Sequence, residues 1–189
     1  MKKINFCLNK KFFYINNSAE KFLSSYENSV ELPIESHPGS FGFKRKNHIH
    51  EGIDFYCEEN DEVYSVEDGI VIDIKNFTGE SVGSHWWNET QMIFIKHKNF
   101  CLNYGEIIVN KNIKIGDEIN CGQHLGNVKT VLKKNKGRPM TMLHIEMYEK
   151  NIKTSVDSWN LNNQKPIGLI DPTIYFLENF FKHKEKSVV

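Results

Sequence analysis

Between residues 41 and 148 the chain consists of short runs rich in β-branched and aromatic residues, separated by Gly, Asn and Asp. Runs of this length and composition predict strands, and the residues between them can supply the backbone angles of tight reversals. The predicted strands are 62–66, 69–74, 92–96 and 143–148, and the clearest turns are 67–69, 116–117 and 121–122. The pattern therefore predicts a mainly β protein, an antiparallel sandwich or barrel-like structure.

Two segments outside this region have helical patterns. Residues 18–26 carry apolar side chains at close to helical spacing, which predicts a short N-terminal helix. Near the end of the chain, Asp171 precedes Pro172, as an N-cap residue precedes a proline at the first helical position. Apolar residues then recur at helical intervals between 174 and 181, which predicts a C-terminal helix.

The chain length favours one domain. With 189 residues, 39% of them hydrophobic and 25% charged, the chain can build one substantial core but not two. We expect an N-terminal extension over residues 1–40, the main domain over 41–178 and a polar tail over 179–189.

Charge and hydropathy argue against two classes of partner. The formal net charge is zero, and the basic runs 44–46 and 133–138 lack the interleaved aromatic residues that stack on bases, so we interpret both runs as solvated loops and expect no nucleic acid. No apolar run approaches the length of a membrane-spanning helix, so no membrane span is expected. No signal peptide is evident, so the chain as given is expected in the cytoplasm, with action at the cell envelope if it is exported.

The four cysteines, at positions 7, 57, 101 and 121, are scattered and form no CxxC pair. Their spacing argues against a cysteine zinc site and favours free buried thiols, although one or two disulfides would be compatible with export.

The most specific local pattern is His50-Glu51-Gly52-Ile53-Asp54, in which an imidazole and a carboxylate flank a glycine. A turn of this kind can aim both groups at one point. Catalytic zinc sites use three protein ligands of this chemistry and leave a fourth position open. The third ligand would have to come from elsewhere in the chain.

Further motifs follow this one in a recognisable order. They are Val63-Tyr64-Ser65-Val66, Asp68-Gly69-Ile70-Val71, Tyr104-Gly105-Glu106, Ile115-Gly116-Asp117-Glu118-Ile119, Gly122-Gln123-His124-Leu125-Gly126 and Met142-Leu143-His144-Ile145-Glu146. In order and spacing this series resembles the lysostaphin/LytM-type zinc metallopeptidases, over residues 41 to 148. The resemblance implies the LytM fold, one Zn²⁺ per chain held by His50, Asp54 and His144, and a peptide substrate, as in bacterial peptidoglycan.

The chain departs from that family at two positions. Glu106 and Met142 stand where the family carries two histidines that do not bind the metal. Met142 cannot move a proton or donate a strong hydrogen bond to an oxyanion. Glu106 can act as a general base, as the glutamate of HExxH peptidases does, but it could also be a fourth zinc ligand or a spectator.

Several other side chains are candidates for supporting roles. Glu146 shares a strand face with His144 by period two, which predicts a partner that orients the imidazole. Arg138 could pair with a substrate carboxylate or be an ordinary surface residue. Trp86 and Trp87 could line a substrate site or cover one end of the sheet.

Two functions therefore remain open at this stage. The first is a zinc-dependent endopeptidase with Glu106 as its base. The second is a catalytically degenerate binding or regulatory module that retains the metal site. The sequence does not define an oligomeric state.

Overall fold

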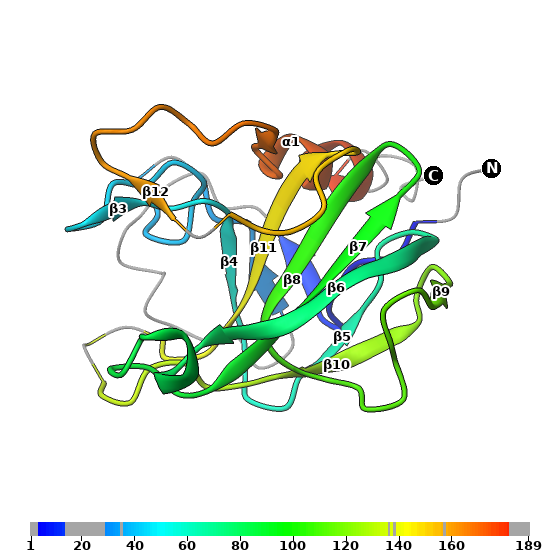
Figure 1. The fold of residues 1–189 in the computed structure, drawn as a ribbon, viewed down its shortest axis with the longest axis horizontal. Coiled ribbons are helices and arrows are strands. Elements are labelled where there is room, and N and C mark those ends of the chain that lie inside the picture. The colour runs from blue at the N-terminus through cyan, green and yellow to red at the C-terminus, as the bar shows by residue number, and fades with distance from the viewer. Residues whose placement is uncertain are drawn as a thin grey trace, which may run out of the picture.

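The computed structural model describes residues 4–13, 29–34, 36–135, 137, 139–156 and 158–181. Most of these residues form antiparallel strands, and a short helix lies near the C-terminus (Figure 1). The predicted fold class is therefore confirmed. The predicted helix at 18–26 and residues 182–189 of the predicted tail lie outside the described residues, whereas residues 179–181 belong to the last helical turn.

The main sheet contains nine strands. They are β4 (Ile53–Tyr56), β5 (Glu62–Tyr64), β6 (Gly69–Thr78), β7 (Thr90–His97), β8 (Phe100–Val109), β9 (Glu118–Ile119), β10 (His124–Val128), β11 (Met142–Glu149) and β13 (Leu169–Ile170). All four predicted strands are present, as β5, β6, β7 and β11, although β5 ends two residues before the predicted end at 66. The residue pattern alone missed β8, which is among the longest strands, although the Tyr104-Gly105-Glu106 motif of the family resemblance lies in it.

Two short strand pairs and three helical segments complete the described elements. The pairs are β1 (Lys11–Phe13) with β2 (Ser29–Glu31), which is parallel, and β3 (His48–Ile49) with β12 (Trp159–Asn160), which is antiparallel. The helical segments are the 3₁₀ turn η2 (Glu80–Val82), α1 (Thr173–Phe176) and the π-helical turn η3 (Leu177–Phe181). No helix among the described residues combines the length and apolarity that crossing a membrane requires.

Strand β11 lies between β4 and β8 and alternates strictly between two environments. Leu143 and Ile145 are fully buried in the main core. His144, which pairs with Asp54 of β4 on one side and with Gly105 of β8 on the other, points to the opposite face. This alternation follows from the two-residue period of a strand. The register of β11 therefore brings His144 and Asp54 side by side.

Strand β8 contains a bulge that changes which side chains face the core. One residue of β7, between Gln91 and Ile93, opposes two residues of β8, between Tyr104 and Ile107. Glu106 lies inside this bulge with a φ of 64°, in the left-handed region that non-glycine residues rarely adopt. Tyr104 and Ile107 both enter the core. The bulge thus shifts the alternation by one residue and turns Glu106 away from the core.

Both ends of the described chain pack beneath β4. Phe55 contacts Phe176 of α1 with ring centroids 5.0 Å apart, and Phe6 lies 5.5 Å from Phe55. Edge-to-face pairs of this kind contribute about 0.5–1.5 kcal/mol each beyond their area burial. The predicted C-terminal helix is present, and Asp171 Oδ1 accepts a hydrogen bond from the backbone N–H of Thr173 at its start.

All four cysteines are buried and none forms a disulfide. Burial raises the pKa of the Cys7 and Cys57 thiols well above the ordinary value. Because the thiolate is the reactive form, neither thiol is activated in the folded chain.

We expect the folded protein to react very slowly with a maleimide at neutral pH, because its thiols are buried and protonated. Four labels per chain should appear once guanidinium unfolds the protein, and mass spectrometry counts them. Rapid native labelling of Cys7 or Cys57 would contradict this packing.

Candidate metal centre

Three side chains from two paired strands and the loop before β4 meet on one face of the sheet. His144 Nδ1 lies 2.8 Å from Asp54 Oδ1, and His50 Nε2 lies 3.0 Å from the same oxygen. The two imidazole nitrogens are 3.2 Å apart. All three residues are buried, with exposed fractions of 1% for His50, 3% for Asp54 and 6% for His144. Their ligand atoms therefore form a compact triangle.

Other contacts fix which nitrogen of each imidazole faces this triangle. His50 Nδ1 lies 2.9 Å from the carbonyl oxygen of Ser40, so Nδ1 carries the proton and Nε2 is left with a lone pair. His144 Nε2 lies 3.1 Å from Glu146 Oε1, so Nε2 is the donor and Nδ1 faces Asp54. Each imidazole thus presents the nitrogen that a metal ion requires.

The donor set fits a divalent metal ion of the zinc type. Tetrahedral coordination at about 2.0–2.2 Å places ligand atoms about 3.3 Å apart, close to the 2.8–3.2 Å separations found here. Two imidazoles and one carboxylate are ligands that zinc prefers, and they leave a fourth position open. Among the described residues, these three have ligand atoms that all lie within 4.8 Å of one another.

Gly52 explains the glycine of the His50–Asp54 motif. A Cβ atom built on Gly52 would lie 2.2 Å from the carbonyl oxygen of Ile145 and 3.0 Å from His144 Cε1. Only glycine allows this close approach of the loop to β11. The motif therefore docks against the strand that carries the third candidate ligand.

The loop before the motif also contacts the centre, through residues that the sequence interpretation assigned to solvent. Arg45 Nη2 donates to Asp54 Oδ2 at 2.7 Å and to the Pro38 carbonyl at 3.3 Å. The backbone N–H of Asp54 donates to the carbonyl of Gly39 at 2.8 Å. The interpretation of Arg45 as part of a solvated basic run is wrong, because its guanidinium is paired with a buried carboxylate.

The electrostatics of the triangle follow from these contacts. Burial opposes ionisation of Asp54, but His50 and Arg45 outweigh burial and hold the pKa of its carboxyl well below the ordinary value. Burial alone would lower the pKa of His144, yet its hydrogen bonds to Asp54 and Glu146 raise it well above the ordinary value. For His50, burial dominates and lowers the pKa.

Glu146 is buried beside His144, and both of its carboxylate oxygens accept hydrogen bonds. Besides His144, its carboxylate accepts hydrogen bonds from Asn103 Nδ2 at 3.0 Å, Tyr148 Oη at 2.8 Å and Ser155 Oγ at 2.6 Å. Burial opposes its ionisation, but these donors outweigh burial and lower the pKa of the carboxyl. An ionised Glu146 holds the ring of His144 in a single orientation.

Glu106 differs from the other acidic groups near the centre. It is 9% exposed, and its Oε2 atom is buried without a hydrogen-bond partner among the described residues. Burial and then the charge of Asp54 raise the pKa of this carboxyl to about 8. Glu106 does not belong to the group of ligand atoms within 4.8 Å, so it lies beside the triangle and does not complete it.

The centre opens into a groove of about 670 Å³. The residues that line it include the candidate ligands His50 and His144 and the acidic residues Glu106 and Glu146. One wall comes from residues between 75 and 87, at the end of β6 and around η2. The other comes from residues between 45 and 51 and from residues 155, 156, 158 and 160. Figure 1 shows that the η2 segment and the β3–β12 pair project to the same side of the sheet.

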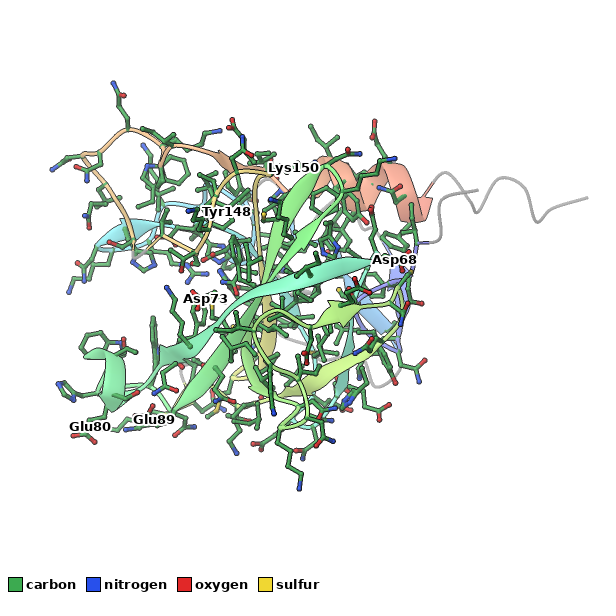
Figure 2. The ribbon with its side chains drawn as sticks, turned by 45° about the vertical axis from the view of Figure 1, so that its right-hand side comes forward. Asp68, Asp73, Glu80, Glu89, Tyr148 and Lys150 are labelled. Carbon is green, nitrogen blue, oxygen red and sulfur yellow. The ribbon has the colours of Figure 1, made fainter. Side chains whose placement is uncertain are left out.

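The two tryptophans belong to the η2 wall. Trp86 is 61% exposed, and its ring centroid lies 6.0 Å from that of Trp87. Glu89 holds this projecting segment by accepting hydrogen bonds from the backbone N–H and hydroxyl of Ser81, and Figure 2 shows Glu80 and Glu89 at its tip. Both tryptophans line the groove, although Trp86 is too exposed to cover the sheet.

Other side chains near the centre have different positions. His48 and Glu51 also line the groove, and Glu51 accepts a hydrogen bond from the backbone N–H of Trp159, which secures β12. Met142 is buried, on the same strand face as His144. Arg138 lies outside the described residues. The sequence interpretation missed the Arg45 contact because a run of basic residues usually faces solvent.

Comparison with known proteins agrees with this geometry. Residues 48–158 match the family model described as peptidase family M23. The match covers more than half of the chain and includes all three candidate ligands. No curated protein matches the chain closely enough to count as a relative.

Solved structures show a similar fold. CbpA from L. salivarius REN is 19% identical with a TM-score of 0.51, over 77% of this chain and 88% of that one. The antimicrobial peptidase lysostaphin from Staphylococcus simulans is 15% identical with a TM-score of 0.51, over 79% of this chain and 52% of that one. At these identities the similarity is one of fold.

Replacing Gly52 by alanine should destabilise the protein by about 3 kcal/mol, the upper range for overpacking, because the new methyl group collides with the Ile145 carbonyl. Chemical denaturation measures the loss. Gly83→Ala is the control for the added methyl, since Gly83 has open space around it, although its positive φ adds a small backbone cost. Equal stability of Gly52→Ala and wild type would contradict the close approach.

Proposed function

This chain belongs to peptidase family M23, and we propose that it is a zinc-dependent endopeptidase that cleaves peptide bonds held in the groove. In this proposal His50, Asp54 and His144 hold one Zn²⁺, and Glu106 is the general base. The geometry of the triangle, the hydrogen bonds that orient both imidazoles and the open groove support it.

The state of Glu106 is the observation that carries the catalytic part of the proposal. Its left-handed backbone costs about 1–2 kcal/mol relative to an ordinary conformation. Its buried Oε2 atom also lacks the partner that buried polar atoms normally have. Such unfavourable features persist together where function requires them. Glycine or asparagine would occupy the bulge at lower cost, but neither carries a carboxylate.

The carboxylate of Glu106 can perform the proton transfers of hydrolysis. When bound, zinc supplies Lewis-acid polarisation of the peptide carbonyl and lowers the pKa of the attacking water. In its ionised form, which predominates above its pKa of about 8, Glu106 accepts a proton from that water as the water oxygen forms the new C–O bond. Glu106 then donates the proton to the amine as the C–N bond breaks. The products are a carboxylic acid and an amine.

Two other roles for Glu106 are less well supported. A fourth ligand should lie with the other ligand atoms, but Glu106 falls outside their 4.8 Å group. A spectator should be solvated or paired, and Glu106 Oε2 is neither. The role of general base agrees with both observations.

We further propose that the substrate is a peptide of bacterial peptidoglycan, which would place the active protein at the cell envelope. A groove of about 670 Å³ accommodates several residues of an extended peptide. Trp86 offers an exposed aromatic face on one wall, and aromatic faces bind apolar portions of peptides and sugars.

A second candidate function rests on Met142. The buried methionine offers neither a proton nor a strong hydrogen-bond donor near the centre, so an oxyanion would lack one family donor. A binding module that retains the metal would tolerate that loss. Hydrolysis assays separate the two functions, because a binding module retains purified peptidoglycan without releasing new peptide termini.

Replacing Glu106 by glutamine should lower kcat about 10²–10⁴-fold, the usual contribution of a general base. Zinc content should stay at one per chain, because Glu106 is not a ligand in this proposal. Release of new amino termini from peptidoglycan measures kcat, and elemental analysis measures zinc.

Glu118→Gln is the matched control, because Glu118 is exposed on β9, outside the groove residues. It should keep wild-type activity. Wild-type activity in Glu106→Gln would remove the base assignment, and loss of zinc in that variant would point to a ligand. Absence of cleavage by zinc-loaded wild type would favour the binding module.

Replacing Trp86 by alanine should raise KM and leave kcat nearly unchanged, because the exposed ring touches substrate far from the reacting bond. The expected loss of a stacking contact is about 0.5–1.5 kcal/mol, or up to roughly tenfold in KM. Steady-state kinetics with a soluble peptide substrate checks it. An unchanged KM would show that Trp86 does not contact that substrate.

A further inference from the structure

Asp54 uses its two carboxylate oxygens for different purposes. Oδ1 faces both imidazoles, at 2.8 Å from His144 Nδ1 and 3.0 Å from His50 Nε2. Oδ2 faces the other way and accepts the hydrogen bond from Arg45 Nη2 at 2.7 Å. The carboxylate is therefore divided between a candidate metal position and a fixed cation.

Arg45 is itself held in place. Its Nη2 atom also donates to the Pro38 carbonyl, and its side chain is only 28% exposed. Backbone hydrogen bonds anchor the loop around it, because His50 N–H donates to the Phe43 carbonyl and Gly42 N–H donates to the His50 carbonyl, both at 2.9 Å. The Nη2 group is thus held between two acceptors, and its charge-assisted hydrogen bond restricts rotation of the Asp54 carboxylate.

We propose that Arg45 is a positioning residue that reserves Asp54 Oδ2 and so makes Asp54 a single-oxygen ligand of the metal. This inference rests on the metal site of the proposed function, and it extends that site to a segment before residue 48, where the family match begins.

The arrangement has a chemical consequence. A carboxylate that binds through one oxygen occupies one coordination position, so a position remains for water and substrate. Without Arg45, Asp54 is free to rotate or to bind through both oxygens.

The test is metal binding by variants that remove the charge of Arg45. Arg45→Met keeps most of the aliphatic stem, and Arg45→Gln keeps a polar end. Either should lower zinc affinity about 10–100-fold, the usual effect of losing a group that orients a ligand. Competition with a chromophoric chelator measures affinity, and the visible spectrum of the Co²⁺-loaded protein reports the coordination number.

The controls use neighbouring lysines and the conservative variant. Lys44→Met and Lys46→Met remove a similar charge from exposed neighbours and should keep wild-type affinity and spectrum. Arg45→Lys should recover part of the affinity, because an ammonium can still donate to Oδ2. The melting temperature of each metal-free variant reports folding separately.

The outcomes are distinct. Wild-type affinity and spectrum in the Arg45 variants would overturn the inference, as would an equal loss in the lysine controls or no recovery in Arg45→Lys. Failure of both neutral variants to fold would also overturn it, because Arg45 would then be needed for the fold. Absence of metal binding by the wild type would instead overturn the proposed function, and the inference with it.

Discussion

The structure of the centre depends on the pairing register of β11. His144 lies opposite Asp54 on one side and opposite Gly105, next to Glu106, on the other. A shift of one residue would send His144 into the core and expose apolar side chains in the groove. Leu143 and Ile145 prevent this shift, because they are fully buried on the opposite face. Packing of the apolar core thus determines where the polar groups meet.

Features that depend on a local sequence pattern were predictable. Features that depend on contacts between different segments of the chain were not. The strands, the C-terminal helix and the His50–Asp54 motif follow from periodicity, turn chemistry and family resemblance. The pairing of Arg45 with Asp54 did not follow, because charge patterns assign a basic run to solvent. The left-handed backbone of Glu106 was also missed, since it arises from a register shift between β7 and β8.

The buried acidic groups of the centre have charged or hydrogen-bonding partners, with one exception. Asp54 is shared by two imidazoles and a guanidinium, and Glu146 receives four hydrogen bonds. These partners offset the desolvation cost of burying a charge in a low-dielectric environment. Glu106 is the exception, with a buried oxygen that lacks a partner and a strained backbone. The unfavourable energy of the site is therefore concentrated in one residue.

The family match and the packed core of the structure begin at different points in the chain. The family match begins at residue 48, yet Ser40 orients His50, Arg45 binds Asp54, and Cys7 and Leu8 enter the main core. The family match covers the strands that carry the candidate ligands, whereas the packed core and the hydrogen bonds of the centre extend beyond it. A domain boundary placed at the start of the family match would cut through one packed core, and sequence variation in the preceding loop could tune the centre without altering any candidate ligand.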